Sequence, residues 1–273
     1  MPERPLTLMA VHAHPDDEAS STGGILARYA SEGTRTVLVT CTNGELGDGP
    51  GGVKPGEPGH VVDEVVALRR AELEKSCAIL GVSDLELLGY HDSGMMGWPQ
   101  NDAPGAFWNT PVEVAAAPLA ALMERYRPQV VVTYDEHGFY GHPDHIQANR
   151  VTLAAIEATG VPDKLYYPGI PRSRLAGFAE LLRQKGIEPP EPMEGDPEFG
   201  TPDELINAVI DCTAFADAKY DSLAAHASQA DNIFFLDMGR ELFASVMGQE
   251  AFVRVQDRTG ARVLEDDLFS GLR

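Results

Sequence analysis

Two short segments carry the residues whose types and spacing could do chemistry. Residues 14–18 have the sequence His-Pro-Asp-Asp-Glu, and residues 142–145 have the sequence His-Pro-Asp-His. Proline presets the first helical turn and keeps the residue before it extended, so each segment predicts a strand-to-helix turn. Residues three apart share one face of such a turn, as His14 and Asp17 would.

Both segments follow apolar stretches, residues 6–13 and 128–135, that predict buried strands. Strands that end at the same edge of one sheet can offer His14, Asp17 and His145 to a single point. Two imidazoles and one carboxylate suit Zn²⁺, and three protein ligands with a fourth position open are typical of a catalytic zinc site. We therefore expect one divalent ion per chain, either zinc or another divalent transition metal.

Two further aspartates, Asp16 and Asp144, lie beside these ligands in the sequence. Asp16 could accept a proton from the attacking water, and Asp144 could hold the other nitrogen of a histidine, as carboxylates near metal sites do. A simpler interpretation takes both as charge complements of helix N-termini. That interpretation explains an aspartate but not the repeat of His-Pro-Asp, so we favour the metal site.

The rest of the chain alternates between strand and helix patterns. The predicted strands are residues 6–13, 34–42, 84–90, 128–135 and 164–170, and the predicted helices are residues 18–32, 63–81, 111–127 and 142–160. This alternation predicts an α/β fold with a Rossmann-like, mostly parallel sheet flanked by helices on both faces. Ligands of such sheets bind at the carboxyl ends of the strands. The first strand is not followed by Gly-x-Gly-x-x-Gly, which argues against a nicotinamide cofactor.

The predicted organisation is a single domain with an extension. Residues 1–170 would form the Rossmann-like, metal-binding catalytic core, and residues 171–200, broken by proline and glycine, predict an inserted surface arm. Residues 201–273 contain two strand patterns and two helix patterns, which predict a smaller α+β segment that packs on the core. Residues 43–62 are rich in glycine and proline and predict a long loop, a kind of segment that is often functional.

Composition narrows the partners and the location. A formal net charge of −21 over 273 residues argues against nucleic acid and against anionic membrane surfaces as partners. The N-terminal residues show no secretion-signal pattern, and no apolar run approaches the roughly 18 residues of a membrane span. The three cysteines are widely spaced and predict reduced thiols, so we expect a soluble cytoplasmic protein. A homo-oligomer remains open.

The two segments also resemble the motifs of a known family. "AHPDDE" (13–18) followed by "TYDEHGFYGHPDH" (133–145) is similar to the LmbE-like, or PIG-L (GlcNAc-PI de-N-acetylase), zinc-dependent deacetylases. Among these, the mycothiol-pathway N-acetylglucosaminyl-inositol deacetylases are the most similar. The resemblance extends through "RRAELEKSCAILG", "HDSGMMG" and "KYDSLAAHASQ". It is clear over residues 5–160, patchy over 202–255 and absent from 171–200.

The resemblance implies a role for each matching residue. The implied zinc ligands are His14, Asp17 and His145. Asp16 would be the general base, His142 would assist the oxyanion or the leaving amine with Asp144 behind it, and Tyr140 could stabilise the oxyanion. The residues implied at the sugar site are Glu45, Arg69, Asp92, Ser21 and His226, although a lone histidine on a helix, like His226, is as often structural.

The predicted function is removal of an N-acetyl group from an N-acetylglucosamine-type amino sugar or its conjugate. One alternative is a mycothiol-conjugate-type amidase, which is disfavoured because such amidases typically carry Lys where this chain has Ser21. A second is a catalytically silent metal- or sugar-binding protein, but such a protein would lack the base, and Asp16 is present. A metallophosphoesterase would often use two metals and more carboxylates. The roles of His12, His91 and His137 stay open.

Overall fold

A seven-stranded sheet forms the centre of the molecule in the computed structural model, which describes residues 5–184, 200–230, 233–260 and 264–273. The strands are β1 (Thr7–His12), β2 (Arg35–Thr42), β3 (Asp84–Tyr90), β4 (Val130–Val132), β5 (Lys164–Gly169), β6 (Ala208–Asp211) and β7 (Gln249–Asp257). Their order is β3-β2-β1-β4-β5-β7-β6. Strands β1 to β5 are parallel, whereas β7 is antiparallel to both β5 and β6. The predicted mostly parallel α/β fold is confirmed.

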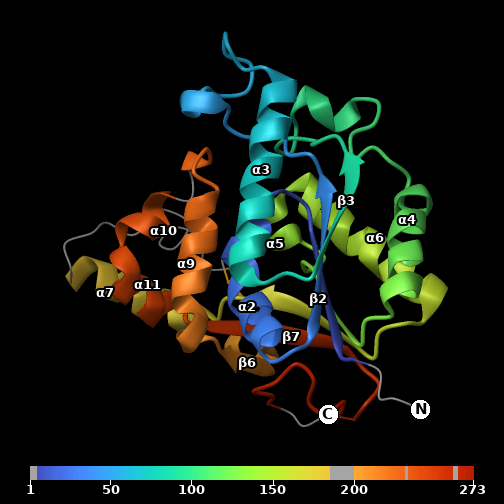
Figure 1. Cartoon of the computed structure of the whole chain (residues 1–273), viewed down its shortest axis with the longest axis vertical. Helices are drawn as coiled ribbons and strands as arrows, with labels where there is room; N and C mark the ends of the chain where they lie inside the picture. Colours follow the sequence, from blue (N-terminus) through green and yellow to red (C-terminus); the bar gives the residue numbers. More distant parts are fainter. Residues whose placement is uncertain (1–4, 185–199, 231–232, 261–263) are drawn as a thin grey trace.

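Helices cover both faces of this sheet. Helices α2 (Gly23–Ser31) and α3 (Val62–Leu80) lie on one face, and α4 (Val112–Tyr126) and α6 (Pro143–Thr159) lie on the other (Figure 1). The remaining helices are α1 (Asp17–Ser21), α5 (Gly138–Gly141), α7 (Arg172–Gln184), α9 (Ala216–Ala225), α10 (Ile233–Asp237) and α11 (Gly239–Met247). Short 3₁₀ turns are η1 (Pro50–Gly52), η2 (Pro99–Asp102), η3 (Asp203–Leu205) and η4 (Thr213–Phe215).

The first strand shows why the sequence forms a sheet covered on both sides. Successive side chains of a strand point to opposite faces. Leu8 and Ala10 pack in the core beneath α2 and α3, while Met9 and Val11 pack in the core beneath α4 and α6, and all four are fully buried. A strand with both faces buried has to be apolar throughout, as this one is.

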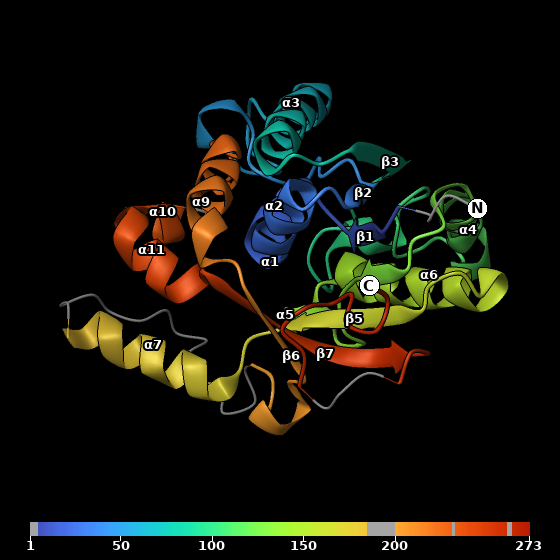
Figure 2. The ribbon, with the colours of Figure 1, turned by 60° about the horizontal axis from the view of Figure 1, so that its bottom comes forward.

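The C-terminal elements join the core through the carboxylate of Glu250. Glu250 of β7 accepts hydrogen bonds from the backbone N–H groups of Gly24 and Ile25 at the start of α2. The same carboxylate lies 2.7 Å from Lys219 Nζ of α9. A carboxylate at a helix N-terminus complements the helix dipole and satisfies N–H groups that have no partner inside the helix. Figure 2 shows α9, α10 and α11 grouped beside α1 and α2.

One predicted helix differs from the structure in detail. The single helix expected over residues 18–32 is divided at Thr22, whose φ of −138° is not helical and whose hydroxyl hydrogen-bonds to the Glu18 carbonyl and contacts His12. The segment predicted as an inserted arm, residues 171–200, begins with α7, whose apolar side chains recur at helical spacing and are buried. Residues 185–199 of that arm lie outside the described residues.

Within the described ranges, none of the helices has the length and apolar character needed to cross a membrane.

Candidate metal centre and active site

The two motif segments meet at one edge of the sheet. The HPDD turn (residues 14–17) follows β1, and the HPDH turn (residues 142–145) follows β4 and begins α6. Because β1 pairs with both β2 and β4, the strand order reverses direction between β1 and β4. In open α/β sheets this reversal point, at the carboxyl ends of the strands, is where ligands bind.

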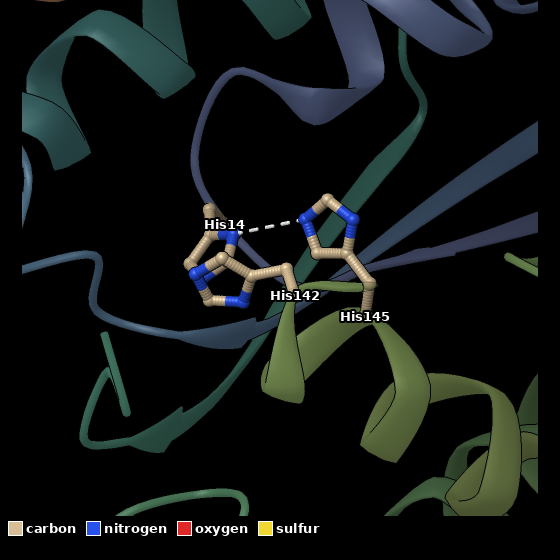
Figure 3. Close-up of side chains that lie close together, drawn as sticks. All are labelled: His14, His142 and His145. Atoms are coloured by element: carbon tan, nitrogen blue, oxygen red, sulfur yellow. Dashed lines mark hydrogen bonds between the residues drawn. The ribbon is translucent and has the colours of Figure 1, made fainter. Parts of the chain in front are cut away.

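Three side chains from these turns bring their donor atoms close together. His14 Nδ1 is 3.3 Å from His145 Nε2, and Figure 3 shows the two rings turned toward each other. Asp17 Oδ2 lies 3.4 Å from His14 Nδ1, and Asp17 Oδ1 lies 3.5 Å from His145 Nε2. A tetrahedral zinc ion bound at its usual distances separates its ligands by about 3.3–3.4 Å, which is the distance between the two histidine nitrogens, and each Asp17 oxygen lies at a similar distance from one of them.

The charges around the three donors also fit a cation. Burial lowers the pKa of His145 to about 4, so this imidazole is neutral and keeps a lone pair for a metal. Burial disfavours the charged form of His14 as well, but Asp92, Asp144 and Asp17 outweigh it and raise its pKa well above the usual value. A bound cation would replace the proton that these carboxylates attract to His14.

The opposite nitrogen of His14 faces two further carboxylates. Its Nε2 is 3.2 Å from Asp144 Oδ2 and 3.7 Å from Asp92 Oδ1. Asp144 is fully buried and accepts hydrogen bonds from the backbone N–H and the hydroxyl of Ser93. Carboxylates in this position orient a metal-bound imidazole and fix its tautomer. The carboxylate expected behind His142 contacts His14, and it also lies within 4.8 Å of a His142 ring nitrogen.

His14 also belongs to a wider group of potential ligands. One ligand atom each from His14, His142 and His145 lies within 4.8 Å of the others, and a second such group joins His14 and His142 to Asp92 and Asp144. We favour Asp17 as the third ligand, because its carboxylate lies 3.4 Å from His14 Nδ1 through Oδ2 and 3.5 Å from His145 Nε2 through Oδ1. With that set, Asp144 would keep its hydrogen bond with His14 Nε2.

Tyr134 was not singled out from the sequence, yet it contacts two of the three donors. Its hydroxyl donates to Asp17 Oδ2 over 2.6 Å and accepts from the backbone N–H of Ala13. Its ring stacks on His145 with centroids 4.1 Å apart. His12, whose role was open, is buried between the Tyr134 hydroxyl and Thr22. The signal in the sequence was a tyrosine two residues past the end of β4, the strand that pairs with β1.

Asp16 has an unusual backbone and a paired carboxylate. Its φ of 129° lies in a region that residues other than glycine rarely occupy, at a typical cost of about 1–3 kcal/mol. Its Oδ2 is 3.1 Å from Arg69 Nη2, and burial raises its pKa to about 6 despite this guanidinium. Strain of this kind is concentrated at functional sites.

His142 begins α6 as its N-cap. Its Nδ1 accepts a hydrogen bond from the backbone N–H of Asp144, so the neutral ring carries its proton on Nε2. Burial, together with the positive charge of nearby His14, lowers the pKa of His142 to about 3. The ring is therefore a neutral hydrogen-bond donor through Nε2.

The residues predicted at the sugar site lie in different surroundings. Buried Glu45 accepts a hydrogen bond from His91 Nδ1 through Oε1, while its Oε2 has no hydrogen-bond partner. Arg69 is buried and donates to the carbonyls of Gly44 and Pro15 in addition to its contact with Asp16.

The other predicted residues range from exposed to fully enclosed. Tyr140 is 53% exposed, with its ring centroid 6.1 Å from that of His142. Ser21 is half-buried at the end of α1 and lies near Ser20. His226 has no exposed surface and contacts Glu18. His137 is exposed, and its Nε2 lies 3.9 Å from Glu136 Oε1.

Fold and donor set together define a class of protein, an α/β protein with a site able to bind a metal ion at the sheet's reversal point. Comparison with known proteins gives the family. Residues 9–156 match the family model described as PIG-L, GlcNAc-PI de-N-acetylase. The chain therefore belongs to the PIG-L family, as the resemblance implied, and it is a hydrolytic N-deacetylase.

Curated relatives match nearly the whole chain. The chain is 42% identical to the 1D-myo-inositol 2-acetamido-2-deoxy-alpha-D-glucopyranoside deacetylase of Acidothermus cellulolyticus, over 97% of this chain and 95% of the relative. It is 42% identical to the protein of the same name from Thermobifida fusca, over 96% and 98%. The N,N'-diacetylchitobiose deacetylase of Pyrococcus horikoshii shares the fold, with a TM-score of 0.59, 19% identity and coverage of 91% and 83%.

Proposed function

We propose that the protein removes the N-acetyl group from an N-acetylglucosamine-type sugar or its conjugate, with N-acetylglucosaminyl inositol as the first candidate substrate. The observation that carries this proposal is the convergence of His14, Asp17 and His145 at the ends of β1 and β4, with Asp16 next to a ligand in the sequence. The names of relatives that are about 40% identical support the choice of sugar.

We propose zinc as the cofactor, one ion per chain, with other divalent transition metals as substitutes. His14 Nδ1, His145 Nε2 and Asp17 would hold it, while Asp144 and Tyr134 orient His14 and Asp17. When bound, such an ion polarises an amide carbonyl and lowers the pKa of water.

Asp16 would move the proton in this reaction. As a carboxylate it accepts a proton from the attacking water, and as the acid it delivers that proton to the leaving amine. Burial raises its pKa to about 6 without metal, and a nearby cation lowers it again, so the carboxylate is ionised and ready to accept a proton near neutral pH. Arg69, 3.1 Å from its Oδ2, holds the carboxylate in place between the two steps.

His142 would donate a hydrogen bond to the oxyanion that develops as the carbonyl is attacked. Its Nδ1 is already occupied by the Asp144 N–H, which leaves Nε2–H as the donor. A donor aimed at developing charge is worth more in the transition state than in the ground state. Tyr140, exposed near His142, is the second candidate donor.

Glu45 and Asp92 would contact the sugar, with Arg69 and Ser21 at the border of the same region. The buried Glu45 Oε2 has no hydrogen-bond partner and could accept one from a sugar hydroxyl. The rival function is an amidase that cleaves a larger thiol conjugate. Ser21 disfavours it, because the amidases of this family typically carry Lys at that position.

The test is a direct comparison of two amides with the zinc-loaded protein. Acetate and free amine are measured after incubation with N-acetylglucosaminyl inositol and with a mycothiol S-conjugate. We expect stoichiometric acetate release from the first and slow cleavage of the second. Faster cleavage of the conjugate would replace the proposal with the amidase function, and no cleavage of either would refute both.

We also propose the organisation and location of the protein. Residues 1–170 would be the catalytic core, with residues 171–200 as an inserted arm and residues 201–273 packed on the core as one domain. A cytoplasmic location is supported by three cysteines that all remain unpaired thiols. A small-molecule sugar is the proposed partner, and nucleic acid, membrane surfaces and a required second copy of the chain are not part of the proposal.

A further inference from the structure

The conformation of Asp16 requires a restraint from elsewhere in the protein. Its φ and ψ are 129° and −23°, and among the described residues only Arg127 and Phe139 also have positive φ without being glycine. Residues held in such regions stay there only when neighbouring groups fix them. Since the direction of a side chain follows from its backbone, whatever fixes this conformation also aims the Asp16 carboxylate.

Glu18 supplies the nearest restraint. Its Oε2 accepts a hydrogen bond of 3.0 Å from the backbone N–H of Asp16, which is the N-cap residue of α1. The contact resembles a capping box, in which a carboxylate early in a helix accepts from the N-cap amide. The Glu18 side chain has no exposed surface, so it has to be held by other protein groups.

The other oxygen of Glu18 is held from two distant helices. His226 Nε2 lies 2.7 Å from Glu18 Oε1, and the Ser76 hydroxyl of α3 donates to the same oxygen. The Ser76 hydroxyl is also 3.1 Å from the hydroxyl of Ser222 in α9. The carboxylate that restrains Asp16 is therefore itself fixed by the C-terminal part of the chain.

The segment that carries His226 is anchored independently of this contact. His226 ends α9, and its backbone N–H donates to the Leu223 carbonyl. Two residues later, both the N–H and the hydroxyl of Ser228 donate to the Glu72 carboxylate. Gln229 then exchanges hydrogen bonds with the backbone of Asp48. His226 thus has a fixed position from which to hold Glu18.

We propose that Glu18 and His226 are positioning residues, which transmit the fixed geometry of the C-terminal segment to the backbone of Asp16 and so aim the general base. The inference rests on the proposed function, in which Asp16 is that base. His226 has no exposed surface through which to touch a sugar, so its effect on the reaction is exerted through Glu18. Glu18 of the HPDDE motif thus positions the base, whereas Asp16 is the base and Asp17 a metal ligand.

The experiment compares His226→Ala, His226→Gln and Ser228→Ala in the zinc-loaded full-length protein. His226→Ala removes a partner of Glu18, and His226→Gln keeps a side-chain N–H that can replace it. Ser228→Ala is the matched control, because it removes a carboxylate partner from the same segment without touching Glu18. Zinc content, thermal stability, kcat and KM for the N-acetyl sugar are measured for each, together with the amide proton shift of Asp16 by NMR.

We expect His226→Ala to lower kcat about 10- to 100-fold, since small misplacements of catalytic groups have effects of that size. KM and zinc content should stay close to those of the parent, and His226→Gln should recover most of kcat. The Asp16 amide proton should move upfield in His226→Ala but not in Ser228→Ala. Should His226→Ala not fold, Ser76→Ala, which removes the other partner of the same oxygen, takes its place.

Three results would overturn the inference. The first is a kcat for His226→Ala no lower than that of Ser228→Ala at equal loss of thermal stability. The second is a raised KM with unchanged kcat, which would mean that His226 contacts the substrate. The third is an unchanged Asp16 amide shift. That shift does not depend on turnover, so it decides the inference even if the protein deacetylates no amino sugar, a result that would refute the proposed function separately.

Discussion

The HPDD turn and the HPDH turn begin with the same three residues but have different structures. In the HPDH turn, His142 is an ordinary N-cap with φ −65° and ψ 130°, and α6 continues for 17 residues. In the HPDD turn, the backbone of Asp16, two residues after His14, has a strained positive φ. Helix α1 then ends after five residues. The first three residues therefore specify a helix start, and contacts from outside each turn decide its geometry.

The aspartate of each His-Pro-Asp also has a different partner. Asp144 of the HPDH turn reaches across to His14 of the HPDD turn, and Ser93 fixes it there. Asp16 of the HPDD turn pairs with Arg69 of α3. Each turn is thus completed by groups from another element, and the donor set forms only when β1 and β4 are neighbours. The predictions below break these contacts, from the largest expected effect to the smallest.

The largest loss should follow removal of a donor from the HPDD turn. In Asp17→Ala one of the three closely spaced donors is missing, so the metal content should fall to near zero and activity with it. Elemental analysis after gel filtration measures the metal. Glu74→Ala, an exposed change on α3, is the control and should keep both metal and activity. An Asp17→Ala protein with a full complement of metal would exclude Asp17 as a ligand.

Asp16→Asn should leave the metal in place and lower kcat about 10²–10⁴-fold, the usual worth of general-base assistance. The ionised carboxylate is the active form, so the parent's kcat/KM should fall as pH falls through the Asp16 pKa. Burial sets this pKa at about 6 without metal, and a nearby cation lowers it, so the acid limb should lie below about pH 6. Asp16→Asn should lack that limb. A pH–rate profile with the same acid limb in both proteins would remove Asp16 from this role.

Tyr134→Phe should weaken metal binding about 10- to 100-fold, because groups that orient ligands have effects of that size. The ring remains to stack on His145, but Asp17 loses the hydroxyl that donates to it. The buried N–H of Ala13 also loses its acceptor, which should cost about 1–3 kcal/mol of unfolding free energy. Competition with a fluorescent chelator measures the affinity, and denaturant unfolding measures the stability. Unchanged affinity with reduced stability would limit Tyr134 to a structural role.

The smallest effect should come from Glu45, which lies outside both turns. Glu45→Gln should raise KM for the amino sugar about tenfold, since a hydrogen bond to a charged group is worth roughly one factor of ten or more. Because the carboxylate is assigned to binding, kcat should change little. Steady-state kinetics separates the two constants. A lower kcat at unchanged KM would place Glu45 in the chemical step.

Much of this architecture could be predicted from the sequence, because apolar periodicity and proline positions act locally. The order of strand and helix in the first 170 residues follows from such signals, as does the placement of both turns at strand ends. The helix α7 could also have been predicted, since Leu175, Phe178, Ala179 and Leu182 recur at helical spacing. The glycines and prolines after residue 184 give the segment as a whole the composition of a loop.

Contacts between distant elements could not be predicted in the same way. Tyr134 reaches Asp17 because Ala10 of β1 pairs with Val132 of β4, and strand order is not visible in a single sequence. The contact of Asp144 with His14 depends on the same pairing. The positive φ of Asp16 has no local signal at all, since glycine is the residue that usually marks such a conformation.

The central claim, that the two turns together hold one ion, is tested most directly by a crystal structure of the zinc-loaded protein with anomalous data at the zinc edge. The account predicts a single strong peak bonded to His14 Nδ1, Asp17 and His145 Nε2, with Asp144 still hydrogen-bonded to His14 Nε2. A peak bonded instead to Asp92, His142 and Asp144, or no peak at the ends of β1 and β4, would contradict it.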